Sequence, residues 1–192
     1  YLKFGFKEED LEKGTIYADA TWFADHKYTP ADIDFALSHE IEHFRELRSL
    51  LHEPNGYRVW ENHRSRVKRD RKLFVLDDVL DNIRVDRAVI ARRPSKRTTG
   101  KDLRLKIEPK DLTKYPKHLQ FIQAIEHKAL TGERCAVDPV VRAEIEELEN
   151  KRSKGGQSVI DVLGDPDLPP SKRLELQQRF FEPVYEKLFQ KD

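Results

Sequence analysis

The sequence contains no methionine and only one cysteine, Cys135, among its 192 residues. A single cysteine excludes an intramolecular disulfide and a cysteine-based zinc finger. No apolar run approaches the roughly 20 residues of a membrane-spanning helix. The N-terminal residues mix Lys with Asp and Glu, whereas a signal peptide needs an apolar run. These absences predict a soluble cytoplasmic protein with no membrane partner.

The absence of methionine also bears on the extent of the chain. Ordinary usage would give about four methionines, and the sequence starts at Tyr1. Both features predict a fragment of a longer protein whose parent chain carries further domains. The alternative is that methionines are missing from the sequence as given, which would shorten some spacings.

The sequence does contain balanced charge and enough aromatic residues for a core. Lys and Arg total 36, Asp and Glu total 35, and the formal net charge is +1. Mean hydropathy is −0.77, yet ten Phe, six Tyr and two Trp are too many for a disordered chain. The composition therefore predicts a polar globular protein.

Apolar periodicity and capping signals predict a mainly helical fold. Thr29-Pro30 opens the strongest predicted helix, and Pro54-Asn55-Gly56 stops it after about residue 51. The β-branched and aromatic residues of 14–23 predict a short N-terminal strand pair. The expected class is therefore α+β, mainly α-helical. Further helices are predicted over 73–92, 117–130, 139–152 and 171–190, the last one kinked or split at Pro183, and residues 101–115 are expected to be irregular.

A metal-binding motif lies in the middle of the predicted 30–51 helix. The run His39-Glu40-Ile41-Glu42-His43 is an H-E-x-x-H sequence. Residues four apart stand one turn apart on one helix face, so both imidazoles can bind one ion. Zinc accepts such ligands and keeps one position for water, whose proton Glu40 can take. The motif predicts a zinc-dependent hydrolase, and the alternative is a pair of structural histidines.

The faces of this helix are also predicted from its periodicity. One apolar stripe, which includes Ile41, and the stripe with the two histidines are expected to be partly buried. Glu42, Arg45, Glu46 and Arg48 are expected to face solvent.

A hydrolytic zinc site needs a third protein ligand, and the predicted 73–92 helix offers carboxylates for it. Asp78 with Asn82, and Asp77 with Asp81, are pairs four apart on the side away from its apolar stripe. A helix antiparallel to the first can aim one of these aspartates at the two histidines. The alternative is an ordinary solvated face.

These residues resemble the gluzincin metallopeptidases. That family joins a helical H-E-x-x-H motif to a second helix with Asn-Glu-x-x-Ser-Asp, where the Glu binds the metal and the final Asp steadies the first His. The stretch 77–82, Asp-Asp-Val-Leu-Asp-Asn, is similar in layout. The resemblance implies Asp78 on the metal and Asn82 in the orienting role. Both depart from the family, since Asp is shorter than Glu and Asn carries no charge.

The region is also similar to the metallopeptidase domains of cobalt-chelatase and nitric-oxide-reductase-activation proteins, which carry a von Willebrand A domain. Those domains have H-E-x-x-H followed by Asn-x-x-Glu-Asp-x-Arg-(Ile/Val)-Glu, and residues 78–86 follow that pattern with substitutions. This register puts Asp81 where the family has its Glu, so Asp78 and Asp81 both stay candidates. The resemblance covers residues 16–94.

The resemblance implies a zinc-dependent peptidase with one zinc ion per chain. His39, His43 and either Asp78 or Asp81 would bind the ion, and Glu40 would be the general base toward a protein or peptide substrate. Asn82, Asp86 and Glu42 are candidates to accept the second N–H of a ligating histidine. Tyr115, His118 and His127 are candidates, by residue type alone, for a transition-state donor.

The expected organisation is a zincin-like domain over residues 1–152, a linker over 153–170 and an amphipathic helical segment over 171–192. The linker is predicted from Gly164 and from three prolines. The terminal helix is expected to pack on the domain, and the alternative is that it blocks the cleft.

Two other functions are compatible with the sequence. One is a non-catalytic, metal-stabilised interaction module in which the aspartate substitutions have blunted hydrolysis. The other is a DNA-associated protease similar to the SprT-like family, which shares H-E-x-x-H. The basic stretches 57–72 and 92–101 favour this nucleic-acid alternative, whereas the balanced total charge favours ordinary solvated faces.

Overall fold

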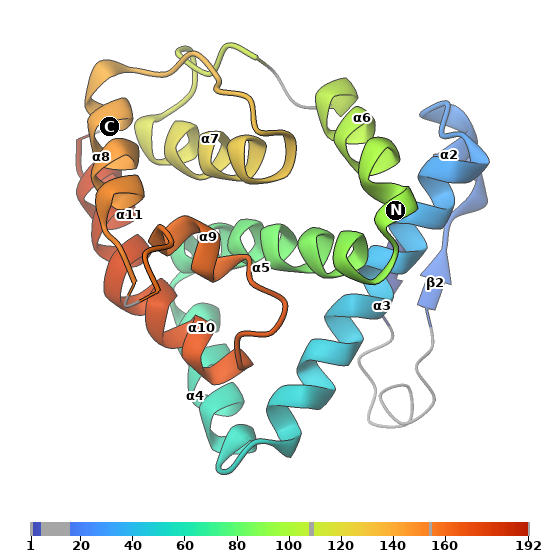
Figure 1. Cartoon of the computed structure of the whole chain (residues 1–192), viewed down its shortest axis with the longest axis horizontal. Helices are drawn as coiled ribbons and strands as arrows, with labels where there is room; N and C mark the ends of the chain where they lie inside the picture. Colours follow the sequence, from blue (N-terminus) through green and yellow to red (C-terminus); the bar gives the residue numbers. More distant parts are fainter. Residues whose placement is uncertain (1, 5–15, 108–109, 154, 192) are drawn as a thin grey trace.

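Helices dominate the computed structural model, which describes residues 2–4, 16–107, 110–153 and 155–191 (Figure 1). The mainly helical prediction is confirmed. No helix in this described part is both long and apolar enough to cross a membrane. The helices, with a 3₁₀ turn η1 and a π-helical turn η2, are α2 (Ala20–Asp25), α3 (Pro30–His52), α4 (Gly56–Arg69), α5 (Arg71–Arg92), η1 (Pro94–Lys96), α6 (Arg97–Ile107), α7 (Lys117–Thr131), α8 (Pro139–Asn150), α9 (Val159–Leu163), α10 (Pro170–Leu176), η2 (Gln177–Phe181) and α11 (Glu182–Phe189).

The α+β class is not confirmed, because the described residues contain almost no β-structure. Strands β1 (Leu2–Phe4) and β2 (Ile16–Ala18) pair antiparallel over three residues each. Apart from two isolated bridges, this ladder is the β-structure of the described residues. The rest of the expected strand region becomes α2, because the Asp19 side chain accepts a hydrogen bond from the Trp22 N–H at 3.0 Å and caps a helix.

The predicted active-site helix is confirmed as α3. Thr29 and Asp32 form a reciprocal capping box, and Pro30 occupies the first turn. The predicted faces are confirmed in part, since Arg45 and Arg48 are exposed and the stripe with the histidines is half-buried. The prediction is wrong for Glu42, which is buried and forms ion pairs with Arg45 and Arg92. Ile41, placed in the apolar stripe, is 37% exposed. Periodicity could not show that other helices would cover the charged side of α3.

Two stretches that looked irregular or merely basic are helical. Residues 56–69 form α4, and residues 97–107 form α6, which overlaps the region 101–115 that was expected to be irregular. Helix α6 packs on α3 and α7 and buries Leu103. Gly100 permits this close approach, since a Cβ atom there would lie 2.5 Å from Cε2 of Phe35. Tertiary packing, which local propensity does not report, therefore stabilises α6.

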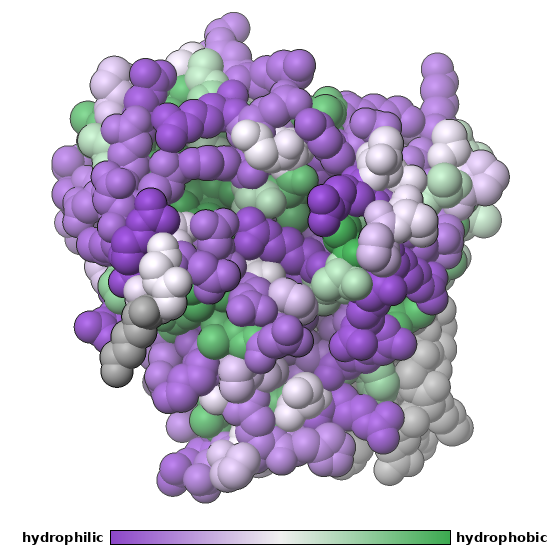
Figure 2. Space-filling model, in the orientation of Figure 1, coloured by the Kyte–Doolittle hydropathy of each residue, from purple (hydrophilic) through white to green (hydrophobic). Residues whose placement is uncertain are grey.

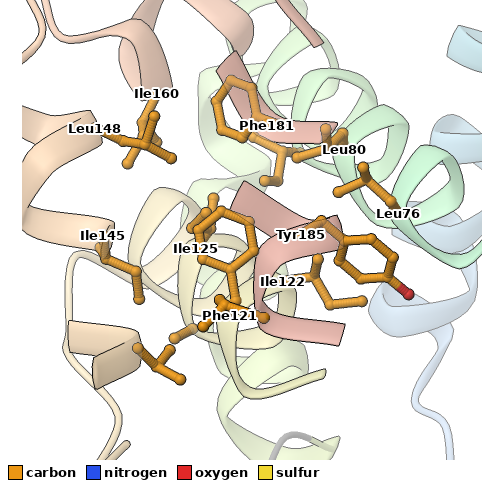
Figure 3. Packing of buried hydrophobic residues seen from close by; sticks show 14 of the residues in the cluster. Leu76, Leu80, Phe121, Ile122, Ile125, Ile145, Leu148, Ile160, Phe181 and Tyr185 are labelled. Atoms are coloured by element: carbon orange, nitrogen blue, oxygen red, sulfur yellow. The ribbon is translucent and has the colours of Figure 1, made fainter. Parts of the chain in front are cut away.

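The core lies around α5 and α7. Figure 1 shows α5 across the middle of the molecule, with α7 alongside it and α3 near its C-terminal end. In Figure 3, Phe121, Ile122 and Ile125 of α7 face Leu76 and Leu80 of α5 and the C-terminal rings. The surface over this core is mostly hydrophilic, with apolar side chains visible in small areas between charged ones (Figure 2).

The C-terminal part of the chain contributes to the same cluster. Val159, Ile160 and Leu163 of α9 are buried in it, although they fall in the predicted linker. Tyr185 of α11 is also in the cluster, so the expected packing of the terminal helix on the domain is confirmed. The predicted break at Pro183 is confirmed as well, since the π-helical turn η2 ends just before it. The division of the chain at residues 152 and 170 stays a prediction about domain organisation.

Candidate metal centre

The two motif histidines converge where α3 packs against α5. His39 and His43 are both half-buried on α3, and their Nε2 atoms lie 2.9 Å apart. Their rings are nearly perpendicular, with centroids 4.6 Å apart. The four-residue spacing on a continuous helix produces this convergence. The Nε2 atoms of the two rings therefore converge, at the distance of an N–H···N hydrogen bond.

The other nitrogen of each ring is held by an aspartate of α5. Nδ1 of His39 donates to Oδ1 of Asp86 at 2.5 Å, and Nδ1 of His43 donates to Oδ2 of Asp81 at 2.7 Å. A hydrogen on Nδ1 leaves the lone pair of the neutral ring on Nε2. This tautomer is the one that a metal ion at the convergence point requires.

Each of these aspartates is anchored by an arginine. Asp86, whose side chain is 2% exposed, accepts hydrogen bonds from Nε and Nη2 of Arg104 at 3.1 and 2.9 Å. Asp81 accepts from Arg84 through its Oδ1 atom at 3.1 Å, while its Oδ2 atom serves His43. Burial alone would raise the pKa of Asp86, but the charge of Arg104 and the contact with His39 hold that pKa below its ordinary value. Asp86 is therefore an ionised acceptor at neutral pH.

Two further carboxylates share the electrostatic environment of the histidines. Burial raises the pKa of Glu40 above its ordinary value, against the opposing effect of the charges of His39 and His43. Burial also raises the pKa of Asp78, and the nearby charge of Asp81 adds to that effect. Asp78 lies one helical turn before Asp81 and Asn82 on α5. Both Glu40 and Asp78 are thus partly desolvated carboxylates beside the histidine pair.

The other residues that the sequence suggested for the site contact different parts of the protein. Asp77 accepts hydrogen bonds from His63 and Gln177, so it faces α4 and the C-terminal segment. Glu42 binds arginines and does not hold either histidine. The ring centroid of His118 lies 4.6 Å from that of Phe189 in α11. The two last candidates by type are Tyr115, which is exposed in the loop before α7, and His127, which is buried within α7.

Sequence reasoning named Asp86 only as one of three orienting candidates, and it missed Arg84 and Arg104. Both arginines lie in charged stretches, which are normally read as solvated. One signal was present for Asp86: it stands five residues after Asp81, so an antiparallel helix can present both carboxylates to histidines four residues apart. No local signal marks Arg104, whose helix was expected to be irregular.

Among the residues that the structure describes, no three His, Cys, Asp or Glu side chains are already grouped as ligands of one ion. A third protein ligand of an ion at the histidine pair would therefore have to rotate toward it. The donor set fits a zinc ion in its chemistry, because two oriented imidazoles lie beside desolvated carboxylates. No protein family, no curated protein and no solved structure matches the chain.

Proposed function

We propose that this chain is a zinc-dependent peptidase that acts on protein or peptide substrates. His39, His43 and Asp78 hold one zinc ion per chain, and Glu40 is the general base. The observation that carries the proposal is the convergence of two Nε2 atoms whose rings are each fixed through Nδ1 by a buried or half-buried aspartate. Carboxylate–histidine pairs of this kind orient zinc ligands in metalloproteins.

The distance between the two nitrogens supports this use. Two zinc–nitrogen bonds of ordinary length at a tetrahedral angle place their nitrogens about 3.3 Å apart. The observed separation of 2.9 Å requires only a small outward rotation of the rings. In the metal-free protein a separation of 2.9 Å is that of an N–H···N hydrogen bond between the two rings, and zinc binding would displace that proton.

Asp78 is a better third ligand than Asp81. Both oxygens of Asp81 are engaged, one by His43 and the other by Arg84. Asp78 is half-buried, and the charges of both histidines act on its carboxyl group. Asp81 therefore orients His43, as Asp86 orients His39, while Asp78 is the carboxylate that can rotate toward the centre.

The chemistry of hydrolysis divides between the ion and Glu40. A zinc ion at this centre supplies a Lewis acid for the substrate carbonyl. Glu40 takes the proton of the attacking water and then passes it to the nitrogen of the leaving amine as the C–N bond breaks. Burial raises the pKa of Glu40 above its ordinary value, which makes the carboxylate a stronger base for the first transfer.

A second function is favoured by one surface. The outward side of α4 carries Arg58, Arg64 and Lys68, and the guanidinium of Arg64 lies 4.9 Å from the ring centroid of Trp60. Cations with an adjacent aromatic ring are typical of nucleic-acid contacts. In contrast, the basic stretch at 92–101 is engaged on α3, where Lys96 pairs with Asp34. DNA binding with a steep salt dependence would support a DNA-associated protease.

The test of the zinc-peptidase proposal begins with metal content, measured by mass spectrometry. We expect about one zinc ion per chain, lost in His39→Ala and retained in His52→Ala, an exposed histidine at the end of the same helix. Casein hydrolysis should then disappear in Glu40→Gln, with zinc retained. Absence of zinc in the unaltered protein would refute the proposal, whereas zinc without hydrolysis would favour the non-catalytic module.

A further inference from the structure

A chain of alternating charges connects His43 to the C-terminal segment. Nδ1 of His43 contacts Asp81, and Asp81 contacts Arg84. Arg84 forms an ion pair with Glu46 of α3, and Glu46 also forms an ion pair with Arg173 of α10. The series His43, Asp81, Arg84, Glu46 and Arg173 is called the C-terminal relay below.

The inner members of the C-terminal relay are withdrawn from water. The side chains of Arg84 and Arg173 are each 5% exposed, and that of Glu46 is 12% exposed. Burial lowers the pKa of each arginine to about 9, which still leaves both charged at neutral pH. Glu46 thus compensates Arg173 and shares the compensation of Arg84 with Asp81. Removing a member of such a group leaves an uncompensated charge, so its neighbours must move.

The branch behind His39 has a different end point. Asp86 contacts Arg104 of α6, and Arg104 contacts Glu126 of α7 at 3.1 Å. Those helices belong to the part of the chain before residue 152. The described contacts therefore tie His39 to α6 and α7, whereas they tie His43 to α10.

The C-terminal segment also reaches α4 and α5 next to the candidate centre. Nε2 of Gln177 donates to Oδ1 of Asp77, the neighbour of Asp78, at 3.1 Å. Two nitrogens of Arg66 donate to Glu182 at 2.5 and 2.6 Å. Residues 170–182 therefore touch the helix of the histidines and the helix of the aspartates at the same time.

We propose that Arg173 is a positioning residue, and that docking of α10 through the C-terminal relay sets the orientation of His43 and hence the zinc affinity of the site. The inference rests on the proposed zinc site. It predicts that the docked C-terminal segment holds His43 in its zinc-binding orientation. It also predicts that zinc binding and docking of this segment are coupled. Since coupling is reciprocal, zinc must stabilise the docked segment as much as docking favours zinc.

The first experiment measures zinc affinity by competition with a chromophoric chelator. We expect Arg173→Gln to weaken zinc binding by about tenfold or more, in the range known for outer residues of metal sites. Arg173→Lys, which keeps the charge, should recover part of the loss. Arg179→Gln is the matched control, because Arg179 is exposed in the same segment and lies over the ring of Phe180.

A stability control separates positioning from general loosening of the fold. Lys128→Gln removes an ion pair with Glu149 between α7 and α8, outside the C-terminal relay. If Arg173→Gln lowers the melting temperature of the zinc-free protein but binds zinc as tightly as Lys128→Gln and the unaltered protein do, Arg173 is only structural and the inference is wrong.

The second experiment needs no variant, and it decides the question if Arg173→Gln does not fold. Hydrogen exchange of the unaltered protein is measured with and without zinc. We expect zinc to slow exchange in α10 more than in α8, because only α10 ends the C-terminal relay. Equal exchange of α10 in both states would overturn the inference, whereas failure of the unaltered protein to bind zinc at all would refute the proposed function.

Discussion

The substitution Asp86→Asn tests how much the buried Asp86 carboxylate contributes to the free energy of unfolding. The Asp86 carboxylate is 2% exposed and accepts one hydrogen bond from His39 and two from Arg104. The amide has the same shape but no charge, and its NH₂ group can accept none of these bonds. Breaking a buried ion pair on one side costs about 3–5 kcal/mol. Arg104 keeps its contact with Glu126, so we expect the lower end, about 3 kcal/mol of unfolding free energy.

The pH dependence of this loss has a defined sign. The pKa of Asp86 is lower in the folded protein than in the unfolded chain. The stability that its ionisation contributes is therefore full above the unfolded pKa of about 3.9, and it disappears as the pH falls through the folded pKa. We expect the difference between the unaltered protein and Asp86→Asn to shrink below about pH 4.

The assay is urea unfolding followed by circular dichroism, in chelator so that metal makes no contribution. Asp34→Asn is the control, because Asp34 lies on α3 and pairs with Lys96, but its side chain is 61% exposed. An exposed pair of this kind should contribute less than about 1 kcal/mol. A loss below about 1 kcal/mol in Asp86→Asn, or a loss equal to that of the control, would refute the buried-acceptor reasoning.

Two further outcomes follow from the same structure. Gly100→Ala should destabilise the protein by about 1–3 kcal/mol, because the new methyl group would overlap Phe35; Gly155→Ala, which meets no atom closer than 3.7 Å, should be nearly neutral in the same thermal scan. Zinc affinity should fall as the pH drops, beginning above pH 6.5, because the charge and hydrogen bond of Asp81 outweigh burial and raise the pKa of His43. In Asp81→Asn this fall should move to lower pH, and a fall at an unchanged pH would contradict that account.

Several helix ends could be predicted from the sequence, because they depend on nearby residues. The capping box at Thr29, the stop at Gly132 and the break at Pro183 each depend on residues within one or two turns. The helical spacing of the H-E-x-x-H motif likewise brings the two histidines together on one face of α3, independently of tertiary contacts. Propensity alone did not encode α6, because a polar, glycine-containing stretch becomes helical here only by packing on α3 and α7.

The roles of the charged residues depended on partners far away in sequence. Glu42 and Glu46 were expected to be solvated, yet they bind arginines from α5 and α10. The sequence left Asp78 and Asp81 equivalent, and the contacts of Asp81 with His43 and Arg84 separate their environments. A carboxylate is the same chemical group in both environments. Only its neighbours in the fold therefore decide whether it is solvated or forms a buried ion pair.

The sequence by itself therefore determined helices α3, α5, α7 and α8, their capping signals and the pairing of His39 with His43, because short-range hydrogen bonds and the 3.6-residue turn act within a few residues. The tertiary structure alone decided which aspartate faces which histidine. Those contacts join residues 38 and 47 positions apart, and they exist only because hydrophobic burial packs α3 against α5 and the C-terminal segment against both.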